Sequence, residues 1–245
     1  MNENKLQIKN ISCRVNDTQI LKNISFEIES GKVVVLMGPN GAGKSTISNV
    51  LMGNPKYEVT SGTIMLNGED ITDLPVNEKA KKGLFMSFQS PVEISGITMT
   101  NFLRTSYNSL KNTNIQLGEF MKLLKTNMAE LGLDSKFRSR FVNSGFSGGE
   151  KKRAELLQLM LFEPKYVILD EIDSGLDVDG IKLVSEMLNN ILKKRKMGVL
   201  IITHYNKILE YIKPDSVIVL KNGEISQTGG IELAHKILES GFNKQ

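Results

Sequence analysis

The chain has 245 residues, of which 40% are hydrophobic and 24% are charged, and its net charge is +4. This composition is typical of a globular protein large enough to bury a core. The basic excess lies in short runs such as NEKAKKG and KKRKMG, which we interpret as solvated helix faces, and this argues against a nucleic-acid partner. The single cysteine, Cys13, excludes an internal disulfide and an iron–sulfur cluster ligated by this chain alone.

No stretch of the sequence predicts a membrane segment. The first ten residues are polar and unlike a signal peptide, and the longest apolar runs, VVVLM and VLIIT, are too short to cross a bilayer. We therefore expect no direct membrane insertion and a cytoplasmic location, or the stroma of an organelle if the gene is organellar.

Alternating polar and apolar residues occur near the start of the chain. Residues 6–15 and 20–28 have the period of two that predicts antiparallel strands at a sheet edge. Residues 33–37 form a continuous apolar strand that leads into a glycine-rich loop, and we expect a helix from about Lys44 to Met52. Together these segments form the strand–loop–helix unit that a phosphate-binding loop requires.

Two further strand signals follow this unit. The stretch GTIMLNGEDI predicts a hairpin that turns at Asn67 and Gly68, because an Asn-Gly pair favours a tight turn. The stretch GLFMSF predicts another strand, which ends at Gln89.

The middle of the chain changes character. Helical spacing dominates residues 90–162, which predicts a helical subdomain inserted into a core formed by residues 1–89 and 163–245. After the insertion, the buried strands expected at 166–170 and 198–204 are separated by a helix. This alternation predicts parallel strands with crossover helices.

A second Asn-Gly pair, Asn222 and Gly223, predicts a hairpin near the end of the chain, followed by a short helix over residues 230–241. The expected fold is therefore α/β. It has a P-loop core of the RecA-like type with a mainly parallel sheet, an N-terminal antiparallel β-region and an inserted helical subdomain.

The stretch GPNGAGKST matches the phosphate-binding loop known as Walker A in full. Glycines let the backbone amides approach phosphates closely, and the helix that follows presents its positive N-terminal end to the same anion. Lys44 is expected to reach the β- and γ-phosphates, and Ser45 to hold Mg²⁺ through its hydroxyl. The residues predicted to bind the nucleotide here are Gly38, Pro39, Asn40, Gly41, Ala42, Gly43, Lys44, Ser45 and Thr46.

Two carboxylates follow the buried strand in YVILDE. Asp170 is expected to support Mg²⁺, and Glu171 to act as the general base that polarises the attacking water. Gln89 is a candidate for contact with Mg²⁺ or that water, although an ordinary loop glutamine fits the sequence equally well. His204 is a further catalytic candidate because it ends a strand of the parallel sheet, where ligands bind, with a structural histidine as the alternative.

The stretch SGFSGGEKKR, residues 144–153, allows two interpretations that are compatible. Ser147 and Glu150 have the spacing of a capping box at the start of a helix. A capping box does not require Gly148 and Gly149, which would leave backbone amides bare for an anion.

This ordered set of motifs resembles ABC-type ATPases over essentially the whole chain. The resemblance implies Mg²⁺-dependent ATP hydrolysis in a head-to-tail dimer with a second copy. It also implies that Ser147, Gly148 and Gly149 bind the ATP of the partner copy, that residues 174–177, including Asp177, cross the dimer interface, and that His204 contacts the γ-phosphate. In many members an aromatic residue stacks on the adenine, and here Val15 stands at that position.

Within the ABC-type ATPases, residues 85–104, 143–158, 169–189 and 202–220 closely resemble the SufC family, the ATPases of the SUF system for iron–sulfur cluster assembly. The resemblance implies partners similar to the SufB and SufD scaffold proteins, and a docking surface around residues 90–103. An ATP-binding subunit of a membrane transporter is the alternative. A chromosome-type head is disfavoured because the sequence has no sustained heptads.

Overall fold

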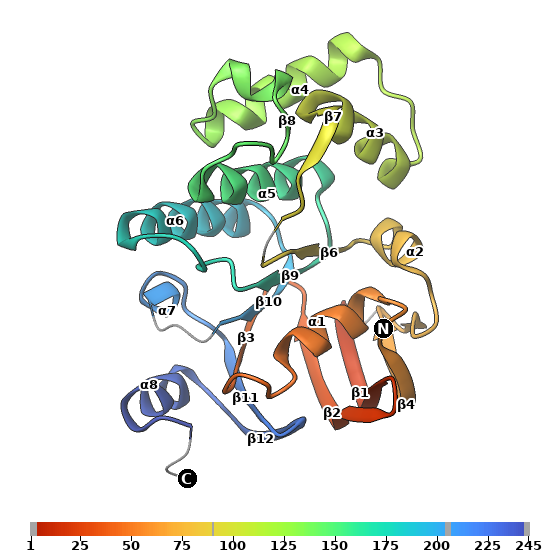
Figure 1. Cartoon of the computed structure of the whole chain (residues 1–245), viewed down its shortest axis with the longest axis vertical. Coiled ribbons are helices and arrows are strands. Elements are labelled where there is room, and N and C mark those ends of the chain that lie inside the picture. Colours follow the sequence, from red (N-terminus) through yellow and green to blue (C-terminus); the bar gives the residue numbers. More distant parts are fainter. Residues whose placement is uncertain (1–3, 90, 204–206, 243–245) are drawn as a thin grey trace.

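The computed structural model describes residues 4–89, 91–203 and 207–242. Its centre is a six-stranded sheet with the order β12-β11-β3-β10-β9-β6, in which neighbouring strands are parallel except for β11 and β12 (Figure 1). The expected mainly parallel sheet is thus confirmed. The strands are β3 (Val33–Met37), β6 (Leu84–Ser87), β9 (Tyr166–Asp170), β10 (Gly198–Ile202), β11 (Ser216–Lys221) and β12 (Glu224–Gly229).

The central strands are buried on both faces, as continuous apolar sequences predict. Every residue of β9 and β10 is buried, whereas the edge strand β12 alternates between exposed and half-buried residues. The turn at Asn222 and Gly223 joins β11 to β12 with left-handed φ angles of 52° and 79°, which confirms the expected hairpin.

A second, antiparallel sheet with the order β2-β1-β4-β5 lies beside the first. Asn67 and Gly68, with φ angles of 52° and 86°, form the expected turn between its last two strands. Figure 1 shows α1 packed against this sheet, and the buried residues of both belong to one apolar cluster with the near face of the six-stranded sheet. The elements are β1 (Lys5–Val15), β2 (Thr18–Glu29), β4 (Glu58–Leu66), β5 (Glu69–Asp70) and α1 (Lys44–Met52).

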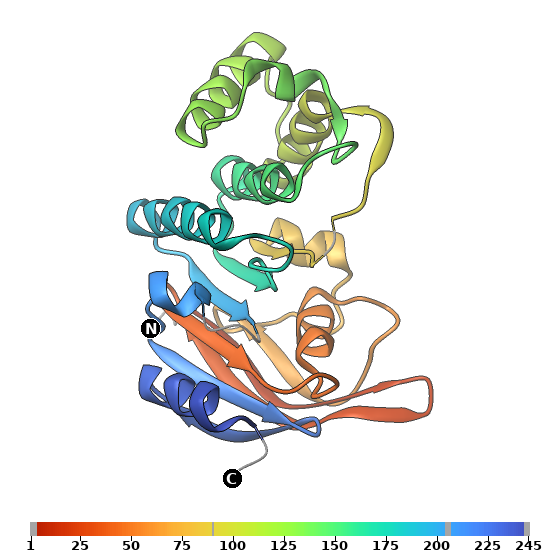
Figure 2. The same cartoon turned by 60° about the vertical axis from the view of Figure 1, so that its left-hand side comes forward.

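The helical part of the chain lies over the opposite face of the central sheet (Figures 1 and 2). The helices α5 and α6 cover the sheet, and α3 and α4 pack beyond α5, so that one apolar cluster runs from the sheet to the outermost helices. The elements are α3 (Met99–Lys111), α4 (Leu117–Glu130), the 3-10 helix η1 (Ser135–Ser139), α5 (Gly148–Phe162) and α6 (Val178–Lys194).

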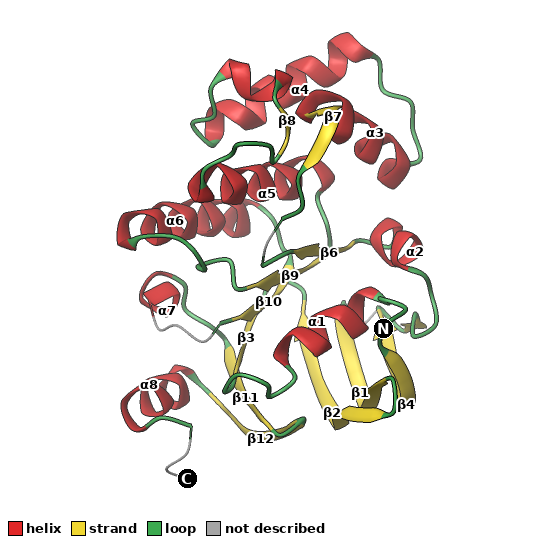
Figure 3. Cartoon of the chain, in the orientation of Figure 1, coloured by secondary structure: helices red, strands yellow, loops and turns green. Residues whose placement is uncertain are grey.

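The region is not purely helical, as Figure 3 shows by colour. The short strands β7 (Ile94–Thr98) and β8 (Phe141–Val142) pair with each other in antiparallel fashion, and α3, α4 and η1 lie between them in the sequence. The sequence did not predict them, because the residues of β7 are exposed or half-buried without the alternation that marks a strand. The division of the chain at residues 90 and 162 stays a prediction.

The short helix α7 (Lys207–Tyr211) was not predicted, whereas α2 (Val76–Lys81) lies on the run NEKAKKG that was expected to be helical, and α8 (Ile231–Ser240) is the last element. The interpretation of NEKAKKG as a solvated helix face is wrong for Lys79, which is fully buried. Its ammonium lies 3.5 Å from the Val50 carbonyl near the end of α1, and burial lowers the pKa of Lys79 to about 8. Within the part of the chain that is described, no helix is long and apolar enough to cross a membrane.

Candidate functional site

The glycine-rich loop joins β3 to α1, and its backbone leaves no room for larger residues at two positions. A Cβ atom on Gly38 would lie 2.4 Å from the Leu220 carbonyl oxygen. Gly43 has a φ of 103°, and a Cβ there would lie 2.8 Å from the Leu21 side chain. The loop can therefore take this path only because glycine stands at these positions.

Lys44 begins α1 and is buried, with its ammonium over the loop. Nζ donates hydrogen bonds to the carbonyl oxygens of Gly38, at 2.8 Å, and Pro39, at 3.0 Å. Burial lowers the pKa of Lys44, and the nearby carboxylates of Glu171 and Asp170 oppose this shift. The loop thus holds a buried ammonium, and this cation suits the binding of a polyanion.

Asp170 and Glu171 lie at the C-terminal end of β9, and both are buried, with 3% and 8% exposure. The Ser48 hydroxyl donates to Asp170 Oδ2 at 2.8 Å. The pKa of Asp170 is raised, mainly by burial, and the Ser48 and Ser45 hydroxyls oppose this shift. Neither acid is therefore an exposed residue at the strand end.

The second oxygen of Asp170 makes this position suitable for a metal ion. Oδ1 is buried, and no residue of the described chain donates a hydrogen bond to it. A buried carboxylate oxygen without a donor is costly, and a hard divalent cation satisfies it. The Ser45 hydroxyl is close enough to the Asp170 carboxylate to act against the rise in its pKa, so the residues present fit Mg²⁺.

Glu171 has a left-handed backbone, with a φ of 50°, and its N–H donates to the Ile202 carbonyl at 2.9 Å. Gln89, just beyond β6, donates from Nε2 to the carboxylate oxygen Oε2 of Glu171. The structure therefore brings Gln89, Lys44 and both carboxylates to one place, at the edge of the sheet where parallel strands end. His204 lies outside the described residues.

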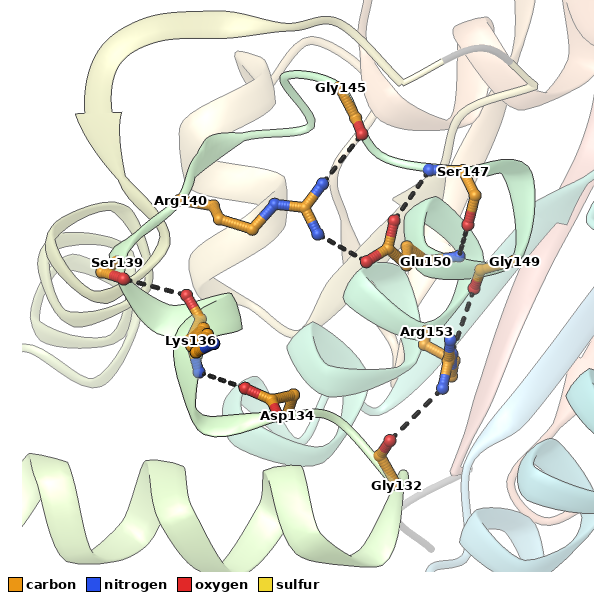
Figure 4. Close-up of polar contacts among 10 residues, drawn as sticks. All are labelled: Gly132, Asp134, Lys136, Ser139, Arg140, Gly145, Ser147, Gly149, Glu150 and Arg153. Atoms are coloured by element: carbon orange, nitrogen blue, oxygen red, sulfur yellow. Dashed lines mark hydrogen bonds and ion pairs between the residues drawn. The ribbon is translucent and has the colours of Figure 1, made fainter.

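The segment before α5 is held by a polar network that Figure 4 shows. Ser147 Oγ accepts from the Glu150 N–H at 3.2 Å, and Glu150 Oε2 accepts from the Ser147 N–H at 2.9 Å, which confirms the capping box. Arg140 donates to the other carboxylate oxygen of Glu150 and to the Gly145 carbonyl, and it stacks on the Phe146 ring. No sequence signal pointed to Arg140, because the contact joins residues ten positions apart through a loop.

Ser147 and Gly148 are exposed at the start of α5 and lie in the same chain's helical part, not at its glycine-rich loop (Figure 1). A Cβ on Gly148 would lie 3.1 Å from the Gly175 carbonyl oxygen, so this segment neighbours residues 174–177. Asp177 caps α6, because its Oδ1 accepts from the Gly180 N–H at 2.8 Å. The structure thus forms two groups of candidate residues, one around Lys44 and one around Ser147.

The role of the Glu150 carboxylate in the capping box can be tested by measuring the stability of the protein at different pH values. The Ser147 N–H and the Arg140 guanidinium lower the pKa of the Glu150 carboxyl from its ordinary value of 4.5. A pKa lowered on folding contributes stability above the unfolded pKa, and this stability is lost as the pH falls through the folded pKa. We expect Glu150→Gln to lower the free energy of unfolding by about 1 kcal/mol at pH 7.

The difference in the free energy of unfolding between the wild type and Glu150→Gln should become smaller as the pH falls below 4.5. Urea unfolding at a series of pH values measures this difference. Glu119→Gln in the first turn of α4 serves as the control, because Glu119 is exposed. A difference in the free energy of unfolding that does not change with pH would contradict the role of the Glu150 charge.

Comparison with known proteins agrees with this geometry. The family model for ABC transporters matches residues 21–174, a span that contains the glycine-rich loop, Gln89, both carboxylates and residues 147–149. The chain belongs to the ABC transporter family. As an ABC ATPase it binds ATP with Mg²⁺ and hydrolyses the ATP.

The relatives of this ABC ATPase span nearly its whole length. It is 46% identical to "Vegetative protein 296" of Bacillus subtilis, over 97% of this chain and 92% of that protein. It is 45% identical to a "Probable ABC transporter ATP-binding protein" of Streptococcus pyogenes serotype M3, over 97% of this chain and 93% of that protein. A solved dimeric structure of a bacterial ABC transporter cassette matches the fold with a TM-score of 0.79 at 21% identity, covering 92% of this chain and 98% of that one.

Proposed function

We propose that this ABC ATPase is a SufC-type subunit, which uses ATP hydrolysis to drive a conformational change in scaffold proteins similar to SufB and SufD during iron–sulfur cluster assembly. Four stretches of sequence that closely resemble the SufC family support this assignment. An ATP-binding subunit of a membrane transporter is the second candidate, and the name of the Streptococcus pyogenes relative favours it.

The observation that carries the proposal is the contact between Gln89 and Glu171. Glu171 is the proposed general base, which takes a proton from the attacking water. Gln89 begins the segment that leads out to the helical part, so a movement of that segment changes the surroundings of the base. Such a contact lets an external partner control hydrolysis.

The other residues of the first group bind and orient the substrate. Lys44 compensates the charge of the β- and γ-phosphates, and the backbone N–H groups of residues 40–46 are proposed to surround them. Ser45, Asp170 and Gln89 are the proposed ligands of Mg²⁺, which neutralises charge on the phosphate oxygens when it is bound. His204 is the proposed contact of the γ-phosphate.

We propose that the second group completes the site of a second copy in a head-to-tail dimer. Ser147, Gly148 and Gly149 are exposed or half-buried at a helix N-terminus, where the amides are suited to an anion. Figure 1 shows α5, which begins at Gly148, away from the loop that joins β3 to α1, and this supports a role on the ATP of another chain. Asp177 lies at the neighbouring helix start and is proposed to face the same interface.

A partner needs a surface on which to dock, and the residues on either side of Gln89, together with β8, offer one. We define the docking surface as Phe88, Val92, Ile97 and Phe141, whose side chains are 57%, 73%, 42% and 46% exposed. Large exposed apolar side chains such as these, on β7, on β8 and in the loop before β7, are typical of a protein interface.

The proposal predicts which proteins accompany the chain from its native host. Affinity purification should recover soluble, cysteine-bearing scaffold proteins, and Val92→Glu should reduce their recovery at least about tenfold, because a charge in an apolar interface is costly to desolvate. Quantitative mass spectrometry of the purified complexes measures the recovery.

Leu117→Glu is the matched control, since Leu117 is 53% exposed at the start of α4 and lies outside the docking surface. A membrane-spanning partner recovered by the wild type would favour the transporter candidate. Equal loss with both variants would contradict the docking surface.

A further inference from the structure

Helix α5 contains a buried ion pair that the proposed reaction does not use. Lys152 and Glu155 are 3% and 4% exposed, and Lys152 Nζ lies 3.4 Å from Glu155 Oε2. Burial raises the pKa of Glu155, and the Lys152 ammonium opposes this shift. A buried ion pair is seldom more stable than apolar residues of similar volume, so its presence calls for another reason.

The other oxygen of Glu155 reaches out of the helix. Oε1 accepts a hydrogen bond from the Phe88 N–H at 3.0 Å, across 67 positions of sequence. Phe88 directly precedes Gln89, whose side chain donates to Glu171. Two consecutive residues are therefore held by separate contacts, Phe88 by its backbone to α5 and Gln89 by its side chain to Glu171.

Helix α5 begins at Gly148, directly after Ser147. Glu155 lies eight residues after Ser147, about 12 Å along a rigid helix. The same helix thus carries the segment proposed to bind a partner's ATP and the carboxylate that holds Phe88. The Phe88 side chain, meanwhile, belongs to the docking surface.

We propose that Glu155 is a positioning residue, which fixes the backbone at Gln89 relative to α5 and so couples the placement of this helix to the contact between Gln89 and Glu171. The inference rests on the proposed roles of Gln89 and Glu171. In this arrangement, a shift of α5 on closure with a second copy, or a shift of Phe88 under a docked partner, reaches Glu171 through one hydrogen bond and one side chain.

Two matched double variants isolate the hydrogen bond from the ion pair. The acceptor variant combines Lys152→Met with Glu155→Gln, which removes both charges but keeps an oxygen that accepts from the Phe88 N–H. The acceptor-free variant combines Lys152→Met with Glu155→Met, which has a similar volume and no acceptor. We expect the acceptor-free variant to turn over ATP about tenfold more slowly than the acceptor variant, because a loosened Gln89 misplaces the reacting groups. Both should bind ATP with a Kd within about twofold of each other, since neither change touches residues 38–46.

Repeating the comparison in a Gln89→Ala background distinguishes action of Glu155 through Gln89 from a purely structural role of Glu155. If Glu155 acts through Gln89, the tenfold ratio should fall to within about twofold there, because coupled residues are not additive. An unchanged ratio in that background would overturn the proposal, and so would equal turnover of the two double variants with Gln89 present.

The Gln89→Ala variant also separates a failure of the proposed role of Gln89 from a failure of the Glu155 proposal. Normal turnover of Gln89→Ala alone would remove Gln89 from its proposed role, and the Glu155 proposal would fall with it. Slow turnover of Gln89→Ala with no difference between the acceptor variant and the acceptor-free variant would overturn the Glu155 proposal alone.

A measurement on the wild-type protein avoids the risk that the acceptor-free variant does not fold. Amide hydrogen exchange, followed in overlapping peptides around residue 88, should show the Phe88 amide protected at least about tenfold relative to an unstructured amide. Exchange at the unstructured rate would mean that the hydrogen bond does not hold in solution, and would overturn the proposal.

Discussion

Glu171→Gln is expected to slow ATP hydrolysis by about 10²–10⁴-fold while ATP binding persists, because only the proton-accepting role is lost. Glutamine has the size of glutamate, and its side-chain oxygen still accepts from Gln89, so the contact seen in the wild type is retained. The substitution also leaves the left-handed backbone as strained as before. Steady-state turnover and nucleotide affinity, measured on the same preparation, test this expectation.

Glu186→Gln is a suitable control, because Glu186 is exposed on α6 and is not among the candidate residues. Near-normal turnover of Glu171→Gln would remove Glu171 from the role of general base. A large loss of ATP affinity would instead show that the carboxylate serves binding, through Mg²⁺ or through Lys44.

The second large effect concerns the proposed sharing of sites between two copies. Lys44→Ala removes the cation at the phosphates and should abolish turnover with the fold intact. Gly149→Asp places an anion where the partner's γ-phosphate is expected. Nothing lies within 4 Å of a Cβ on Gly149, whereas a Cβ on Gly148 would lie 3.1 Å from the Gly175 carbonyl oxygen, so Gly149 is the position that disturbs the fold less.

Each variant alone lacks both sites of its homodimer, but a mixed dimer rebuilds one complete site. In an equal mixture half of the dimers are mixed, so turnover should recover to about a quarter of the wild-type value if the two sites act independently. ATP turnover of each variant and of the mixture, with the scaffold partners present to bring the copies together, measures this recovery.

A purely structural capping box makes a different prediction for the same mixture. Mixing would then rescue nothing, and Gly149→Asp would mainly lower the thermal stability. No recovery in the presence of the scaffold would contradict the sharing of sites. Normal hydrolysis by Lys44→Ala alone would contradict the assignment of the phosphate-binding loop.

The sequence predicted those elements whose signals are local. The helix from Lys44 to Met52, the strand Tyr166–Asp170 and both Asn-Gly turns lie where the pattern placed them. In each case the periodicity, the apolar run or the turn residues are contained in fewer than about ten positions, so no distant contact is needed to interpret them.

The features that the sequence did not predict depend on contacts between distant segments. Lys79 belongs to a basic run and is buried only because α2 packs at the end of α1. Arg140 and Glu155 gain their partners, Glu150 and the Phe88 N–H, through the folding of the helical part. Neither residue type nor spacing distinguishes them from the many charged residues on the surface.

The backbone at Glu171 gives this position an unusual constraint. Of the nine non-glycine residues with a left-handed φ in the described chain, seven are asparagine, and the other two are Glu163 and Glu171. A glutamate in this conformation costs about 1 kcal/mol relative to residues that adopt it readily. Selection for thermal stability alone would therefore favour glycine or asparagine at residue 171, at the expense of hydrolysis. With Glu171 in its proposed role as general base, engineering this protein for robustness by such substitutions is expected to give a more stable protein that binds ATP without turning it over.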